Sequence, residues 1–72
     1  MKLRIDREAD ALYLHLSDSP ILESDEVAPG IVLDFNADNE VVGIEILYLS
    51  TRAPTFDADT LLVETTPART GQ

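Results

Sequence analysis

Apolar and polar residues alternate along several short stretches of this chain, most clearly between Gly30 and Leu49. This stretch reads GIVLDF, then NADNE, then VVGIEILYL, so two runs rich in Val and Ile flank a cluster of Asn and Asp. Successive side chains of a strand leave opposite faces of the sheet, so alternation with period two is typical of a half-buried strand. The pattern predicts a β-hairpin with its turn at residues 36–40, where Asn39 suits a backbone of positive φ.

The N-terminal part of the chain alternates in the same way. The apolar side chains of residues 1–6 are Leu3 and Ile5, and residues 11–16 contain three leucines at spacing two. A helix over residues 8–16 competes with this interpretation, because Leu and Ala favour helices. Leucines at spacing two would spread around a helix, so we favour two strands separated by a polar turn.

The middle of the chain is less regular. Residues 21–27 (ILESDEV) follow Pro20 and carry three acids. They predict an edge strand or an extended segment whose charges discourage unwanted strand addition. A turn at residues 28–30, which contains Gly30, then leads into the hairpin.

Beyond Leu49 the alternation ends, and two interpretations stay open. Residues 50–53 suit one helical turn, and residues 55–59 begin with a cap residue followed by acids, as helices do. Residues 61–66 instead contain clustered β-branched residues, which are typical of a strand. We favour a short helical turn followed by a final strand.

The expected fold is mainly β (α+β): a single antiparallel meander sheet of about four to six strands, with a short helical segment near the C-terminus. Residues 1–66 form the one domain, and residues 67–72 are expected to be a flexible tail. One face of the sheet is aliphatic and collects Leu3, Ile5, Leu12, Leu14, Leu16, Leu33, Phe35, Val42, Ile44 and Ile46. We expect Phe56, Leu61, Leu62 and Val63 to cover part of this face and the uncovered rest to be a dimer surface.

The small size of the chain strengthens the case for a partner. A domain of 72 residues has a thin core, and such domains usually add disulfides, a metal or another chain. The chain has no cysteine and one histidine, so disulfides are excluded and no metal or cofactor is expected. A second copy or another protein is what remains.

The net charge of −9 narrows the choice of partners. An acidic surface repels nucleic acid and anionic lipid and suits a basic protein. DNA binding through Lys2, Arg4 and Arg7 is a third hypothesis, and it conflicts with this charge. The sequence shows neither a signal peptide nor an apolar run of the roughly 20 residues that a membrane span needs, so we expect a cytoplasmic protein.

Residues that could carry chemistry gather on the face opposite the aliphatic one. They are Arg4, Asp6, Tyr13, His15, Asp34 and Glu45. His15 beside Asp34 or Glu45 could act as a general base or bind a divalent metal. The simpler interpretation, which we favour, is a set of cross-strand polar pairs on a wet face.

Asp6, Asp10 and Gly43 are expected to shape the chain, and Arg52 is a further candidate for the polar face. Asp6 and Asp10 suit turn capping better than a calcium loop, because the loop lacks the glycine that such sites need. Gly43 interrupts an apolar strand, so it marks a bulge or a close approach by an aromatic ring such as that of Tyr13. Arg52 is expected to pair with Glu45 or Asp34.

Two blocks of the sequence, MKLRIDREADALYLHLSDSP and APGIVLDFNADNEVVGIEIL, resemble the small bacterial and archaeal family known as domain of unknown function 2283. The matching positions are Asp6, Glu8, Asp10, Ala11, Leu12, Tyr13, Gly30, Asp34, Phe35, Val42, Gly43, Ile44, Glu45, Ile46, Leu47, Ser50 and Arg52. Ile5 and Asn39 depart from the Tyr and Gly that members often carry there. The resemblance implies a small, mainly β protein with no assigned activity and an antitoxin-like role for members encoded beside a toxin.

The first functional hypothesis is therefore a non-enzymatic interaction module that forms a homodimer or binds a basic protein. The alternative is a small enzyme or a divalent-metal-binding protein that uses His15 with Asp34 and Glu45. The sequence contains no nucleophile triad or phosphate loop that would favour the alternative.

Overall fold

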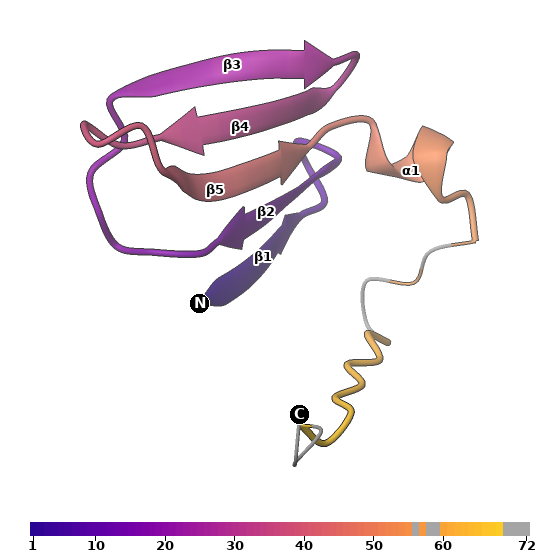
Figure 1. The fold of residues 1–72 in the computed structure, drawn as a ribbon. Coiled ribbons are helices and arrows are strands. Elements are labelled where there is room, and N and C mark those ends of the chain that lie inside the picture. The colour runs from indigo at the N-terminus through magenta and orange to yellow at the C-terminus, as the bar shows by residue number, and fades with distance from the viewer. Residues whose placement is uncertain (56, 58–59, 69–72) are drawn as a thin grey trace.

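The computed structural model describes residues 1–55, 57 and 60–68 and contains five strands and one short helix. The elements are β1 (Lys2–Asp6), β2 (Ala11–His15), β3 (Glu23–Ala28), β4 (Ile31–Phe35), β5 (Val41–Ile46) and α1 (Leu49–Arg52). All strand pairs are antiparallel and belong to one sheet (Figure 1). The expectation of a mainly β fold with a short helix near the C-terminus is confirmed. The N-terminal region forms two strands and not the competing helix.

The strand order is β1-β2-β5-β4-β3, so the sheet does not keep the sequence order of a meander. Strands β2 to β5 have a Greek-key order, in which the long connection precedes three hairpin-linked strands. The apolar strand β5 takes the centre, where both of its edges are paired. The acidic strand β3 takes one edge, where charged side chains are tolerated and protect the open backbone.

The C-terminal part differs from the expectation. One helical turn precedes Pro54, but the described residues 60–68 contain no strand. A β-rich sequence forms a strand only where it finds a partner strand and a packing surface, and in Figure 1 this segment runs away from the sheet. Residues 69–72 of the expected flexible tail lie outside the described residues.

The two ends of the sheet are closed by different means. At one end the β2–β3 connection passes the start of β5, where the backbone N–H groups of Leu16 and Ser17 donate to the carbonyl of Val42. At the other end α1 lies beside the β1–β2 turn, because Leu49 N–H donates to the carbonyl of Asp10 at 2.9 Å. The helix is therefore attached to an end of the sheet and not to one of its faces.

Candidate functional site

The aliphatic face consists of two rows of side chains that cross four strands. The first row is Leu3, Leu14, Ile44 and Leu33, and the second row is Ile5, Leu12, Ile46 and Ile31. Directly opposed residues on one face of an antiparallel pair lie close enough to pack together. On β3 the same face continues with Glu23 and Asp25, which lie opposite Phe35 and Leu33. The face is thus aliphatic over four strands and acidic along one rim.

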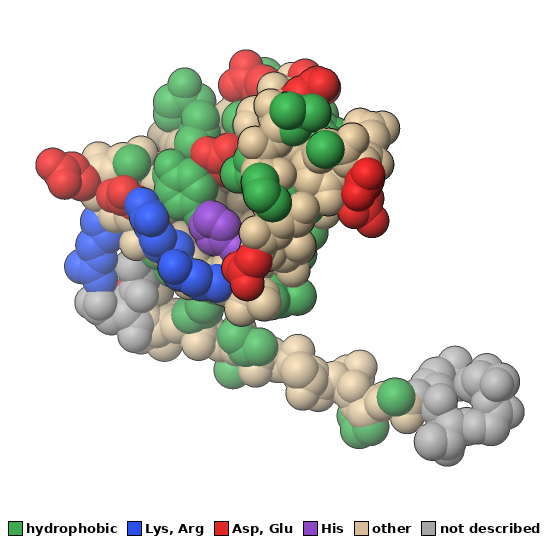
Figure 2. Space-filling view, turned by 90° about the vertical axis from the view of Figure 1, so that its left-hand side faces the viewer, with side chains coloured by type: hydrophobic (Ala, Val, Ile, Leu, Met, Phe, Trp, Pro, Cys, Tyr) green, Lys and Arg blue, Asp and Glu red, His purple; other side chains and the backbone are tan. Residues whose placement is uncertain are grey.

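Little of the described chain covers the aliphatic face. Among the described residues, the buried apolar side chains are Ala11 and Val42, and no large side chain is fully buried. In the two rows Leu3 is exposed and the other seven side chains are half-buried. The expected C-terminal lid is wrong for Leu61, Leu62 and Val63, which are 46, 77 and 74% exposed; its fourth member, Phe56, lies outside the described residues. Figure 2 shows apolar side chains of this segment exposed well away from the sheet.

The opposite, polar face has two rows of its own. One contains Arg4, Tyr13, Glu45, Val32 and Glu26, and the other contains Lys2, His15, Gly43, Asp34 and Ser24. A shallow pocket of about 300 Å³ lies over these rows and is lined by Arg4, Tyr13, His15, Ile21, Ser24, Asp34 and Glu45. Arg4, Tyr13, His15, Asp34 and Glu45 therefore line one pocket, whereas the other two polar-face candidates from the sequence, Asp6 and Arg52, do not line it.

Two carboxyl groups meet at the floor of this pocket. Asp34 is 6% exposed and accepts a 2.6 Å hydrogen bond from the hydroxyl of Ser24. Burial, a hydrogen bond to Asp34 and the charge of Asp34 together raise the pKa of Glu45. The charge of Asp34 thus favours the protonated form of Glu45, since neighbouring carboxylates resist joint ionisation.

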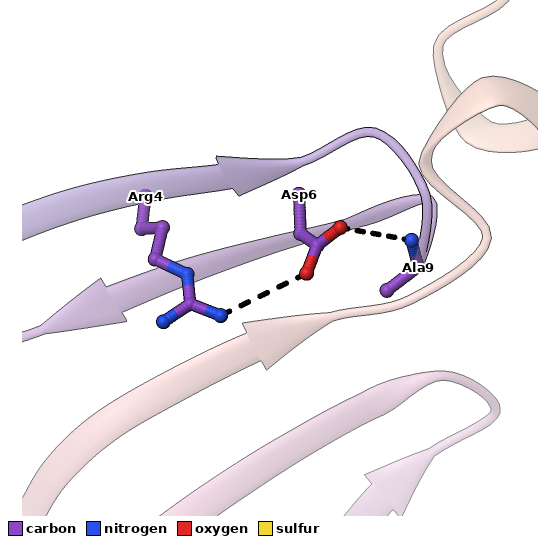
Figure 3. A network of polar contacts seen from close by, with 3 residues as sticks. All are labelled: Arg4, Asp6 and Ala9. Atoms are coloured by element: carbon purple, nitrogen blue, oxygen red, sulfur yellow. Dashed lines mark hydrogen bonds and ion pairs between the residues drawn. The ribbon is translucent and has the colours of Figure 1, made fainter.

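Basic and aromatic side chains form the other side of the pocket. The Arg4 guanidinium lies 5.3 Å from the centre of the Tyr13 ring, which stacks on His15 at 6.5 Å between ring centres. Arg4 also pairs with Asp6 at 3.7 Å, and Asp6 accepts a hydrogen bond from the N–H of Ala9 at 2.9 Å (Figure 3). Arg4 is therefore held by an ion pair and an aromatic ring of its own hairpin.

His15 does not join the carboxyl pair. It lies opposite Gly43, and Asp34 lies opposite the other edge of Gly43, so two strand spacings of about 10 Å in all separate the two backbones. Among the described residues, no three His, Cys, Asp or Glu side chains are grouped to hold a metal ion. The pocket thus brings the sequence candidates together as neighbours, without the geometry of a metal centre.

Gly43 lies beside a β-bulge, and another side chain approaches it closely. The pairing of β4 with β5 shifts between Asp34 and Phe35, opposite Gly43 and Val41. A Cβ atom on Gly43 would lie 2.9 Å from Oδ2 of Asp34. The side chain that approaches this glycine is therefore the buried carboxylate of Asp34, where the sequence suggested the Tyr13 ring.

Asp10 connects the first turn of the sheet to α1. Its carboxylate accepts hydrogen bonds from the N–H of Ser50 at 2.9 Å and from the hydroxyl of Ser50 at 2.7 Å. Its backbone has a φ of 54°, a left-handed conformation that Asp tolerates better than most residues. Asp10 therefore caps a helix 40 positions away in the sequence, and not the local turn that the sequence suggested.

Arg52 fastens α1 to the β3–β4 turn. Its guanidinium donates to the carbonyl of Leu47 at 3.0 Å and to the carbonyl of Pro29. The expected ion pair of Arg52 with Glu45 or Asp34 is wrong, because these carbonyls bind the guanidinium. Gly30 has a φ of 75°, and a Cβ atom there would meet Arg52 at 2.8 Å and the Tyr48 ring at 2.9 Å.

Asn36 is a structural residue that the sequence analysis missed. Its side-chain oxygen accepts from the N–H groups of Asp38 and Glu40, and its amide donates to Ser19 and to the Glu40 carboxylate. Asn39, in the same turn, has the expected positive φ, at 60°. An Asn at the first position of a predicted turn is a signal for such a hub, whereas its bond to Ser19 depends on the path of a distant loop.

Comparisons with known proteins give one match, to a protein family. A family model described as "Protein of unknown function (DUF2283)" matches residues 2–50, which include all five strands. Searches of curated proteins and of solved structures found no match. No helix in the described part of the chain is long and apolar enough to cross a membrane. Because the family model spans more than half of the chain, this protein belongs to the DUF2283 family, whose function is unknown.

Proposed function

We propose that this protein is a small, acidic protein-interaction module with no catalytic activity, and that its aliphatic sheet face is the binding surface. The observation that carries the proposal is the aliphatic face, where Leu3 is exposed, the other seven side chains of the two rows are half-buried, and none is fully buried. Contiguous apolar surface that stays accessible and is rimmed by polar residues is typical of an interaction site.

The polar contacts of the chain support the same proposal. Among the described residues, no buried side-chain N or O atom lacks a hydrogen-bond partner. The buried polar groups are thus satisfied within the described part of the chain, whereas the side chains of the aliphatic face stay partly accessible.

The charge of the chain suits a basic protein as the biological target of the module. Strand β3 carries Glu23, Asp25 and Glu26, all exposed, along one edge. An antitoxin-like role, in which the module binds a basic toxin, is one form that this function could take. A cytoplasmic location is part of the proposal, in keeping with the absence of cysteine.

Light scattering combined with a hydrophobic dye tests the proposal on the purified full chain. A dimer that binds no dye, or a monomer that binds dye at its open face, supports an interaction module. A stable monomer that leaves the dye unbound at all concentrations would overturn it, because its aliphatic face would then already be covered.

The pocket favours one second candidate function. It places His15, Asp34 and Glu45 around one cavity of about 300 Å³, so a small enzyme or divalent-metal-binding protein stays an alternative proposal. Calorimetric titration of zinc and manganese into the wild type and His15→Ala tests the metal version. Heat that is present in the wild type and lost in the variant would favour it, and flat traces for both proteins would rule it out.

A further inference from the structure

The pocket on the polar face has opposite charges at its two ends. Arg4 of β1 borders one end, and Asp34 of β4 and Glu45 of β5 border the other. Arg4, Tyr13 and Glu45 lie in one row that crosses two strand pairs, so the backbones of Arg4 and Glu45 are about 10 Å apart. Charges of both signs around one space are complementary to a ligand that itself carries both signs.

Contacts within the sheet fix the two carboxyl groups. Asp34 is 6% exposed, and its Oδ1 accepts a 2.6 Å hydrogen bond from the hydroxyl of Ser24. Its Oδ2 lies 2.9 Å from the place that a Cβ atom of Gly43 would take, so the glycine leaves room for the carboxyl group. Glu45 is hydrogen-bonded to Asp34. An ammonium group has three N–H donors and no acceptor, so it can donate to both carboxyl groups at once.

The guanidinium of Arg4 keeps donors for a ligand at the opposite end. A guanidinium has five N–H donors, and the ion pair of Arg4 with Asp6 is long, at 3.7 Å. The guanidinium lies over the Tyr13 ring, 5.3 Å from the ring centre, and the Arg4 side chain is 57% exposed. A planar guanidinium binds a carboxylate through two parallel hydrogen bonds. Arg4 is thus held by its own hairpin and can still bind a carboxylate.

The size and lining of the pocket limit the class of ligand. Its volume of about 300 Å³ is at the lower end of the range for small-molecule sites. Tyr13 and Ile21 add apolar surface to the lining. A phosphate group would be repelled by the neighbouring carboxyl groups. These limits favour a short carbon chain that carries one ammonium and one carboxylate group.

We propose that this pocket binds a small zwitterion of the amino-acid class, with the ammonium group on Asp34 and Glu45 and the carboxylate on Arg4. Charge-assisted hydrogen bonds of about 2.8 Å at each end, with a three-carbon chain between the charged groups, span roughly the 10 Å that separates Arg4 from Glu45. The site lies on the face opposite the aliphatic rows, so it does not depend on the proposed function.

NMR titration of the full chain, labelled with nitrogen-15, tests the site with γ-aminobutyrate as the probe. Propylamine lacks the carboxylate of this probe and butyrate lacks its ammonium group, so the two are matched controls. The amide signals of Tyr13, His15 and Glu45 should shift with γ-aminobutyrate, at a dissociation constant about tenfold lower than for either control, because each control loses one set of charge-assisted hydrogen bonds. Equal affinity for γ-aminobutyrate and propylamine, or no shift of these signals, would overturn the proposal.

Two variants with the same change of charge separate the site from the overall charge of the chain. Arg4→Gln should weaken the binding of γ-aminobutyrate about tenfold, to the level of propylamine. Arg7→Gln, at an exposed turn position that does not line the pocket, should keep the wild-type affinity. The amide spectrum of each variant without ligand shows whether the sheet is intact, as the exposure of both arginines leads us to expect. Equal weakening by the two variants would overturn the assignment of Arg4.

Discussion

The two faces of the sheet differ in how far their side chains find partners within the chain. The polar face ties its charged groups to one another: Arg4 pairs with Asp6, and Asp34 binds Ser24 and Glu45. The aliphatic face holds two rows of Leu and Ile, and the described part of the chain supplies no layer above them. The polar face thus satisfies several of its charged groups within the chain, whereas the aliphatic face is the surface that we propose binds another protein.

Substitutions at two adjacent positions of β2 give the largest expected effect and can break this comparison. Leu14 lies in the aliphatic row, and His15 lies on the polar face. Leu14→Asn should dissociate the proposed assembly and lower the free energy of unfolding by about 2–4 kcal/mol, because an amide replaces a half-buried leucine that a partner would cover. His15→Asn should leave the oligomeric state unchanged and cost about 0.5 kcal/mol or less.

Sedimentation velocity and urea unfolding at one protein concentration measure both effects of this pair. The same incoming residue in both variants removes differences in helix or strand propensity. Equal losses from Leu14→Asn and His15→Asn would show that the two faces are not distinct.

Substitutions of Asp10, which attaches α1 to the sheet, should give the next largest loss of stability. They test whether polar contacts affect stability without affecting the oligomeric state. Asp10→Ala removes two hydrogen bonds to Ser50 and places Ala at a positive φ, so we expect a loss of about 2 kcal/mol. Asp10→Asn keeps an acceptor and tolerates this φ, so it should lose about half as much. Urea unfolding gives the cost, and light scattering should show the wild-type oligomeric state for both variants.

The turn at the other end of the sheet gives a smaller effect. Asn39 has a φ of 60°, so Asn39→Val should lower the free energy of unfolding by about 1–2 kcal/mol, whereas Asn39→Gly should be neutral or mildly stabilising. Thermal melts compare the variants. A Val variant as stable as the wild type would contradict the role of this residue in the turn.

Local patterns predicted the strands and their faces, because alternation acts between neighbouring residues. Leu3, Leu14, Ile44 and Leu33 lie in one row as their parity required. Local patterns did not predict the strand order, because the order depends on which strand pairs with which edge of the sheet. In the structure β5 lies between β2 and β4, and the acidic β3 lies at the edge. The expected strand near Leu62 fails for a related reason, since its β-branched neighbours find no partner edge.

The contacts that fasten the helix were less accessible from the sequence. Asp10 caps Ser50 from 40 positions away, and Asn36 binds Ser19 from a connection that crosses the end of the sheet. A local pattern contains no information on such distances. The sequence can identify polar residues in predicted turns as structural. Their hydrogen-bond partners are known only once the arrangement of the strands is known.

The smallest expected effect is the pH dependence of stability that Glu45, on the polar face, should cause. The pKa of Glu45 is raised above its usual 4.5 by burial and by Asp34, so between 4.5 and the raised pKa the folded state binds more protons than the unfolded state. The free energy of unfolding should therefore fall as pH rises through this window, because stability decreases with pH wherever the folded state holds the extra proton. Glu45→Gln lacks this proton and should gain stability relative to the wild type as pH rises, with little difference below pH 4.5.

Urea unfolding from pH 4 to pH 8, at a fixed protein concentration, measures this change in slope. Glu8→Gln is the control, because it also removes one carboxyl group, at an exposed position in the β1–β2 turn. If Glu45→Gln and Glu8→Gln shift the profile alike, Asp34 does not raise the pKa of Glu45. The polar face would then be no more self-contained than any solvated surface, and the contrast between the two faces would rest on the aliphatic rows alone.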